Sequence, residues 1–172
     1  MSDWIYGLSI LGNLGETFPE NSSLAILVIL LILVLLLLSA FFSSAEIAMF
    51  SLSKHRIDAM VTEDVSNAKV VSRLRESPQN LLVTLLVGNN IVNIAMASVT
   101  TSVLALYYTG GIAIALSTLI ITILVLVFGE IIPKSYAIRN PESWSIKIAR
   151  MVDFFESMFS PVVLVFIRLA QI

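Results

Sequence analysis

The sequence has no cysteine, one histidine (His55) and few charged residues. Without cysteine the chain cannot form disulfides, thiolate metal sites or a cysteine nucleophile, and a single histidine rules out a histidine-rich zinc or iron site. Charged residues make up 13% of the 172 residues, against about 25% in a typical soluble domain. The net charge of −2 gives no indication of a nucleic-acid partner.

The missing charges leave two long uncharged stretches. Asp, Glu, Lys and Arg are absent from Ser23 to Ala45 and again from Ser77 to Gly129, and the mean hydropathy of the chain is +0.96. A membrane-spanning helix needs about 20 apolar residues, so the first stretch has room for one such helix and the second for two. The composition therefore predicts an all-α integral membrane protein with three transmembrane helices and excludes an ordinary soluble enzyme.

Helix-start and turn signals divide the chain further. Ser22 and Ser23 are good N-cap residues, Pro78 suits a first helical position, and Tyr107 to Gly111 indicates a tight turn with interfacial aromatic residues. We therefore expect an extracytoplasmic N-terminal segment at residues 1–23 and three transmembrane helices at about 24–50, 79–106 and 112–138. Residues 139–172 are expected to form a juxtamembrane helix with a truncated C-terminal end.

Basic residues in the short connecting segments indicate the orientation in the membrane. The N-terminal segment and the turn at 107–111 contain no Lys or Arg, whereas a polar loop at 50–79, expected to hold a short helix, and the segment after Pro133 contain several. By the positive-inside rule the N-terminus lies outside and the C-terminus in the cytoplasm, in a multi-pass protein of the cell membrane. The basic residues counted are Lys54, Arg56, Lys69, Arg73, Arg75, Lys134, Arg139, Lys147 and Arg150.

The segment from Trp144 to Phe159 has the pattern of an amphipathic helix. Apolar residues such as Ile148 and Val152 recur at helical spacing, with Lys147 on the other side. A helix of this kind lies on the cytoplasmic membrane surface, and packing beneath its own bundle or a partner domain is an equally good interpretation. The apolar residues 161–172 are expected to be a short hydrophobic ending or a junction to a further domain.

Glu130 is an acidic residue inside the third expected transmembrane helix. An unpaired carboxylate is costly in a membrane. Protonation of Glu130, an Arg or Lys side chain reaching it from elsewhere, or a bound cation would lower the cost. The alternative is an ion pair with Lys134, four residues later. Pro133 should break the third helix near this point, because it removes the hydrogen bond to the carbonyl of Gly129. Broken helices with free carbonyls are one way in which membrane proteins bind cations.

The first and second expected helices supply further oxygen atoms. Asn89, Asn90 and Asn93 lie within about one turn of the second helix, and Ser43 and Ser44 lie in the first. The asparagines have an ordinary alternative role in hydrogen bonds between helices, worth ~0.6 kcal/mol each. The serines also have an ordinary alternative role, in hydrogen bonds to carbonyls one turn earlier in their own helix.

The depth of these polar groups favours a single site. Ser43, Asn90 and Glu130 lie roughly 10, 16 and 12 Å from the cytoplasmic ends of their helices, at a rise of 1.5 Å per residue. Hydroxyl, amide, carbonyl and carboxylate oxygens suit Mg²⁺, Ca²⁺ or Na⁺ better than softer metals. With a single carboxylate the site would hold a divalent ion only moderately, which favours transport over storage.

Three stretches resemble the signatures of one family. Phe42–Glu46, Gly88–Asn93 and Gly129–Lys134 are similar to motifs of the membrane domain of cyclin-M (CNNM)/CorC magnesium transporters, and the resemblance spans roughly Leu24 to Ser160. It implies three transmembrane helices, a juxtamembrane helix, a homodimer and export of Mg²⁺ driven by Na⁺ entry. Members normally continue into a cytosolic CBS-type regulatory module, so a chain that ends at Ile172 looks like an excised membrane domain.

The same resemblance assigns roles to individual residues. It implies a metal site formed by Ser43, Asn90 and Glu130, with backbone carbonyls near Ser43 and at Gly129. It also implies a set of residues that support this site or a second, sodium-binding one: Asn89, Asn93, Ser44, Pro133 and Lys134.

We therefore predict a magnesium transporter that works by alternating access, in which Glu130 neutralises the ion and Ser43 and Asn90 complete its shell. The alternative is a membrane anchor or Mg²⁺ sensor that transports nothing and positions a cytosolic module. A pore-forming toxin is disfavoured because no strongly amphipathic pore lining is present. An enzyme is not expected, because the bundle contains no obvious pair of nucleophile and base.

Overall fold

The computed structural model describes residues 22–106, 108 and 111–170, and within these residues every regular element is a helix. The prediction of an all-α membrane protein is confirmed, because three of the helical segments are long and apolar enough to cross a membrane: Ser23–Ser51, Pro78–Leu104 and Gly111–Arg139. Nearly all of the expected extracytoplasmic segment 1–23, and most of the expected turn at 107–111, lie outside the described residues.

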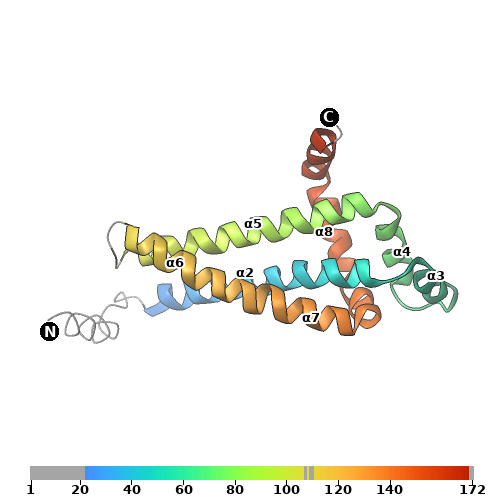
Figure 1. Ribbon diagram of the computed structural model, residues 1–172, viewed down its shortest axis with the longest axis horizontal. Helices are drawn as coiled ribbons and strands as arrows, with labels where there is room; N and C mark the ends of the chain where they lie inside the picture. Colours follow the sequence, from blue (N-terminus) through green and yellow to red (C-terminus); the bar gives the residue numbers. More distant parts are fainter. Residues whose placement is uncertain (1–21, 107, 109–110, 171–172) are drawn as a thin grey trace.

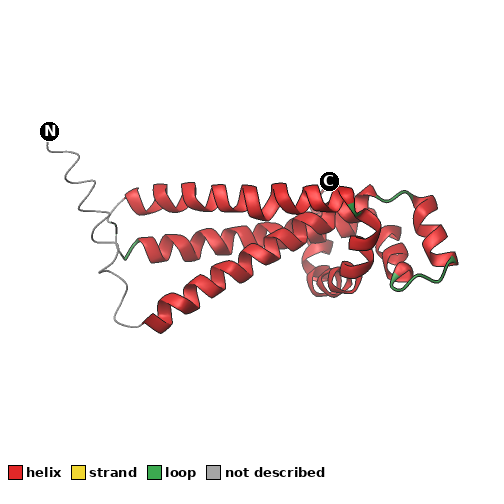
Figure 2. Ribbon diagram, turned by 90° about the horizontal axis from the view of Figure 1, so that it is seen from below, coloured by secondary structure: helices red, strands yellow, loops and turns green. Residues whose placement is uncertain are grey.

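The three spans lie side by side along the long axis of the molecule (Figure 1, Figure 2). The first is α2 (Ser22–Ser51) and the second is α5 (Pro78–Leu104). The third is formed by α6 (Gly111–Leu124), η1 (Val125–Ile131) and α7 (Ile132–Arg139) in succession. Helix α2 packs against both other spans. Its outer apolar side chains are widely exposed, Leu37 for example at 63%, as expected for a surface that faces lipid.

The interruption expected near Pro133 is a π-helix, η1, that ends two residues before the proline. In this segment the Ile132 N–H bonds the carbonyl of Val127, five residues earlier. In a π-helix the carbonyl of Phe128 would accept a hydrogen bond from residue 133, and in an α-helix the carbonyl of Gly129 would. Residue 133 is a proline, which has no N–H to donate. Neither carbonyl therefore receives a bond from Pro133.

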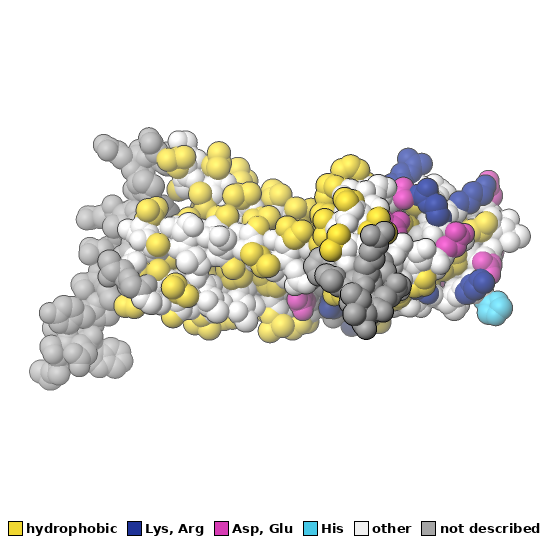
Figure 3. Space-filling model, turned by 90° about the horizontal axis from the view of Figure 1, so that it is seen from above, with side chains coloured by type: hydrophobic (Ala, Val, Ile, Leu, Met, Phe, Trp, Pro, Cys, Tyr) yellow, Lys and Arg dark blue, Asp and Glu magenta, His cyan; other side chains and the backbone are white. Residues whose placement is uncertain are grey.

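The loop between the first two spans holds two short helices where the sequence predicts one. Helix α3 (Lys54–Thr62) is capped by Ser53, whose Oγ accepts from the Arg56 N–H at 3.3 Å. Helix α4 (Ala68–Glu76) begins after Asn67, which has a φ of 62°. Figure 3 shows that charged side chains gather at this end of the molecule, while the length of the spans is mostly apolar or uncharged.

The last helix, α8 (Pro141–Ala170), runs across the long axis of the bundle near the end that carries α3 and α4 (Figure 1, Figure 2). It continues through Pro161, where the sequence predicts a separate ending. Ile148, Ala149 and Val152 are buried, whereas Lys147 is exposed, so the segment is amphipathic as predicted. Because α8 contacts α2, α4 and α5, its buried face packs against its own bundle.

Side-chain bonds fix α8 to the short helices. The Arg56 guanidinium donates to both carboxylate oxygens of Glu142, at 2.6 and 2.8 Å. Arg73 pairs with Asp153, and the Arg150 Nε donates to the Asn67 side chain at 2.9 Å. Helices α3, α4 and α8 therefore form one connected layer at this end of the bundle.

Candidate functional site

A buried serine joins the first two spans in the interior of the bundle. Ser39 on α2 is fully buried, and its Oγ donates to the Oδ1 of Asn93 at 2.9 Å and lies 3.2 Å from the Oδ1 of Asn89. The two asparagines are four residues apart on α5, so both side chains lie on the face that packs against α2. We call Ser39, Asn89, Asn93 and the adjacent Gly129 the Ser39 cluster.

Gly129 brings the third span into this cluster. A Cβ atom added at Gly129 would lie 2.8 Å from the Oγ of Ser39 and 3.4 Å from its Cβ. A side chain at this position would therefore displace Ser39, and glycine allows the η1 backbone to approach α2 closely. The cluster is thus built from all three spans: a hydroxyl from α2, two amides from α5 and the backbone of η1.

Ser43 lies one turn beyond Ser39 on the same helix. Its Oγ is buried and has no hydrogen-bond partner among the described residues. The alternative role predicted for the serines, a bond to a carbonyl earlier in the helix, is found instead at Ser44, whose Oγ donates to the Phe41 carbonyl at 3.0 Å. Ser44 also accepts the Nε1–H of Trp144 from α8 at 3.0 Å. Ser43 is therefore the serine whose oxygen is available for another ligand.

Glu130 follows Gly129 in η1 and is partly exposed. Its alternative partner Lys134 lies with its Nζ 3.8 Å from the Oε2 of Glu46 on α2. Within the described part of the chain no ion pair involves Glu130. The carboxylate is thus next to the Ser39 cluster in the chain and is not taken up by the lysine one turn away.

Asn90 is placed differently from its neighbours. Successive residues of an α-helix are about 100° apart around its axis, so Asn90 is exposed while Asn89 and Asn93 face α2. Its role as a metal ligand therefore stays a prediction. The structure brings together the two supporting asparagines with Gly129 and with Ser39, a residue that the sequence reasoning left out of the site. The sequence feature that could have identified Ser39 is its position one helical turn before Ser43.

Phe42 of α2 packs against both α5 and α8 beside this region. Its ring fills the space above Gly88 on α5, where an added Cβ would collide with the ring carbons. The ring also packs against Phe41 and against Phe155 of α8, with centroid distances of 5.3 and 4.8 Å. An aromatic layer contributed by α2 and α8 therefore packs against α5 at Gly88.

The sequence matches the family described as the cyclin M transmembrane N-terminal domain over residues 30–172. It is 40% identical over 105 residues to the UPF0053 inner membrane protein YfjD of Escherichia coli, an alignment covering 60% of this chain and 24% of that protein. A UPF0053 protein of Haemophilus influenzae is 36% identical over 126 residues, covering 73% of this chain and 30% of its own length.

A more distant relative has a named transport activity. The polyamine export protein of Haemophilus influenzae is 26% identical over 146 residues, which cover 78% of this chain and 34% of that protein. The chain thus spans about a quarter to a third of the length of these three relatives.

Proposed function

This chain belongs to the cyclin M transmembrane domain family, and we propose from that membership that it carries Mg²⁺ across the membrane, as the membrane part of an exporter driven by Na⁺ entry. The role is transport and not catalysis. One observation carries the proposal: in the interior of the bundle, side-chain oxygens of α2 and α5 meet beside the backbone of η1.

Three side-chain oxygens come together at Ser39. Its Oγ donates to the Oδ1 of Asn93 at 2.9 Å and lies 3.2 Å from the Oδ1 of Asn89. The buried Ser43 Oγ, one turn further along α2, has no hydrogen-bond partner among the described residues. Neutral oxygens gathered in this way are ligands that a hard cation such as Mg²⁺ accepts.

Charge for a divalent ion comes from Glu130 in this proposal. Neutral oxygens orient a cation, but at least one carboxylate is typical of a site that takes Mg²⁺ from water. Glu130 is next to Gly129, and the carbonyls of Phe128 and Gly129 lack the bond that residue 133 would give. Asn90 would reach the ion only after α5 turns about its axis, and we propose that this turn accompanies alternating access.

The proposal includes an orientation and an assembly. The basic α3–α4 end faces the cytoplasm and the N-terminus lies outside, following the positive-inside rule. The whole protein is a homodimer in which a cytosolic CBS-type module follows the membrane domain. The exposed amide of Asn90 supports the dimer, because a polar side chain that faces lipid is costly and a second copy would cover it.

The test is ion flux in proteoliposomes that contain this chain and a Mg²⁺-sensitive dye. We expect an imposed Na⁺ gradient to drive Mg²⁺ movement and Glu130→Gln to reduce the rate by about tenfold or more. Glu63→Gln, which removes an exposed carboxylate just after α3, is the matched control and should transport normally. Full transport by Glu130→Gln would refute the role of this carboxylate.

The same assay separates the alternatives. Binding of Mg²⁺ by the chain without any flux would favour the anchor or sensor over the transporter. Because one relative is named a polyamine export protein, spermidine is included as a second cargo. Flux of spermidine without flux of Mg²⁺ would replace the proposed substrate.

A further inference from the structure

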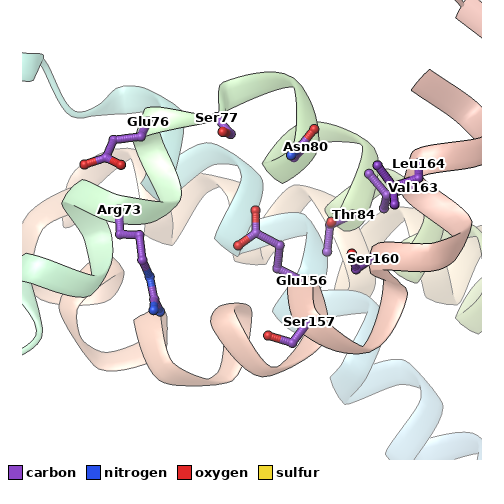
Figure 4. Close-up of a pocket in the computed structure, with 10 residues that line it drawn as sticks. All are labelled: Arg73, Glu76, Ser77, Asn80, Thr84, Glu156, Ser157, Ser160, Val163 and Leu164. Carbon is purple, nitrogen blue, oxygen red and sulfur yellow. The ribbon is translucent and has the colours of Figure 1, made fainter. Parts of the chain in front are cut away.

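A polar cavity lies between the start of α5, the end of α4 and the middle of α8, apart from the Ser39 cluster. It has a volume of about 330 Å³ and is drawn in Figure 4. Glu156 of α8 extends into it, facing Asn80 and Thr84 of α5, and Ser160 lies on the next turn of α8 (Figure 4). We call this space the Glu156 cavity.

Thr84 is the side chain that the protein leaves unsatisfied in this cavity. It is fully buried, and its Oγ1 has no hydrogen-bond partner among the described residues. Figure 4 shows its side chain directed into the cavity, between Glu156 and Ser160. A buried hydroxyl without a partner costs free energy, so a ligand or ordered water that reached the Thr84 Oγ1 from the cavity would stabilise the protein.

The charge around the cavity is negative. Glu76 and Glu156 both line it, and the one basic residue among its lining residues, Arg73, pairs with Asp153. Burial raises the pKa of the Glu156 carboxyl, the nearby Asp153 raises it further, and Arg73 lowers it. A carboxyl group in this setting is stabilised by any cation that can replace its proton.

The cavity is open to solvent and has room for several water molecules. Mg²⁺ gives up its waters reluctantly and is commonly held by one or two carboxylates through a partly retained hydration shell. The groups on the wall are a carboxylate, an amide and hydroxyls, all of which accept hydrogen bonds from water or bind a hard cation directly.

From these observations we propose that the Glu156 cavity is a second cation site, which holds a hydrated divalent ion between Glu156, Asn80 and Thr84. The proposal rests on the proposed function in one respect, since the orientation makes this the cytoplasmic side, where an exported ion enters. Thr84 is one turn from Gly88, on which the Phe42 ring packs, and Asn89 of the Ser39 cluster is the next residue along α5. The ion would wait here before the aromatic layer opens.

The absence of cysteine allows a direct test with a single spin label. Ser157→Cys places a nitroxide at the cavity, and Ser102→Cys places one near the far end of α5, roughly 33 Å along the helix from Asn80. Mn²⁺ is added as the probe to the labelled chain in lipid nanodiscs. Glu130→Gln is present in every sample, so that the intramembrane site contributes little.

We expect Mn²⁺ to broaden the spectrum at position 157 saturably, with Mg²⁺ competing, and to leave position 102 unchanged. Glu156→Gln should weaken the effect about tenfold, and Glu63→Gln should not change it. Calorimetric titration of the unlabelled Glu130→Gln chain with Mg²⁺, with and without Glu156→Gln, repeats the comparison free of any effect of the label.

Two results would overturn the proposal: no saturable broadening at position 157, or equal binding with and without Glu156→Gln. Both differ from a failure of the proposed function, which would show as unchanged flux in Glu130→Gln liposomes. Binding in the cavity can therefore be established or rejected whatever the flux assay finds.

Discussion

Gly129 is the residue at which the third span comes closest to the first. An added methyl group would meet the Ser39 Oγ at 2.8 Å, so Ser39 would have to leave Asn89 and Asn93 or the helices would have to separate. We expect Gly129→Ala to lower the free energy of unfolding by about 1–3 kcal/mol, the usual cost of overpacking. Denaturant unfolding of the chain in detergent micelles measures the change.

Two further variants make this prediction specific. A Cβ added at Gly111 has no neighbour within 4 Å, so Gly111→Ala should have a much smaller effect. In a Ser39→Ala background the hydroxyl is gone and the new methyl group meets the Cβ of residue 39 at 3.4 Å and the Cγ1 of Val125 at 3.5 Å, so the cost of Gly129→Ala should fall. An equal cost in both backgrounds would show that the close approach to Ser39 is not the reason for the glycine.

The site residues show which features of the site can be predicted from the sequence and which cannot. Depth, which follows from the rise per residue, predicts that Ser43, Asn90 and Glu130 share one site, and this ligand set stays a prediction. The structure places Ser39 of α2 against Asn89 and Asn93 of α5, beside the backbone of Gly129. Which asparagine faces inward depends on the rotation of α5 about its axis. A step of one residue changes the direction by about 100°, and three nearly adjacent asparagines provide no pattern that distinguishes Asn90 from Asn89.

Among the elements, α8 is held to the first span by Trp144. Its Nε1–H donates to Ser44, and its ring packs edge-on against Tyr136 of α7. Trp144→Phe keeps an aromatic ring and removes the donor, a loss of about 1 kcal/mol for a partly buried hydrogen bond. We expect the backbone amides of α8 to exchange with deuterium about fivefold faster, as measured by mass spectrometry on the chain in nanodiscs.

The ion pair between Arg56 and Glu142 provides the comparison. Both side chains are almost half exposed, and an exposed ion pair contributes little and is screened by salt. Arg56→Gln should therefore speed exchange less than Trp144→Phe, with a difference from the parent that shrinks at high salt. If Arg56→Gln has the larger effect, the charged layer and not the tryptophan holds α8 in place.

The elements also differ in how well the sequence predicts them. The three spans are recognisable because uncharged length alone is sufficient to identify a membrane helix. The π-helix η1 is not, because the apolar pattern of residues 125–131 is the same for bonds to the fourth or the fifth residue. Pro161 indicates an end to α8, yet the helix continues, since one proline removes one hydrogen bond while the apolar residues on both sides favour further helix.

For the whole molecule, the distribution of charge defines how it lies in a bilayer. Charged side chains gather at the end where α3, α4 and α8 form a layer, and the spans beyond are largely free of them (Figure 3). Helix α5 has 27 residues, about 40 Å at 1.5 Å per residue, enough to cross a hydrocarbon core of about 30 Å. Helix α8 crosses the bundle axis near this end (Figure 1), so with the spans crossing the bilayer we expect it to lie along the membrane plane.

Within the membrane, one face of α5 is poorly suited to contact with lipid. Leu86, Asn90 and Ile94 recur every four residues and are all exposed, Ile94 at 70%. The amide of Asn90 lies between two apolar side chains, with no described residue to cover it. A second copy packed on this face would remove the amide from lipid and bury the apolar residues on either side of it, which is the proposed homodimer.

The cysteine-free chain allows this dimer face to be located in native membranes. Ile94→Cys places one thiol on the Asn90 face, and Leu119→Cys places one on the exposed side of α6 (59% exposed). We expect oxidation to cross-link two copies through Ile94→Cys and not through Leu119→Cys, because thiols form a disulfide only when their Cα atoms come within about 7 Å. Cross-linking at Leu119→Cys alone would move the interface to the third span. It would also leave Asn90 facing lipid, and the amide would then need another explanation, such as the turn of α5 toward the Ser39 cluster.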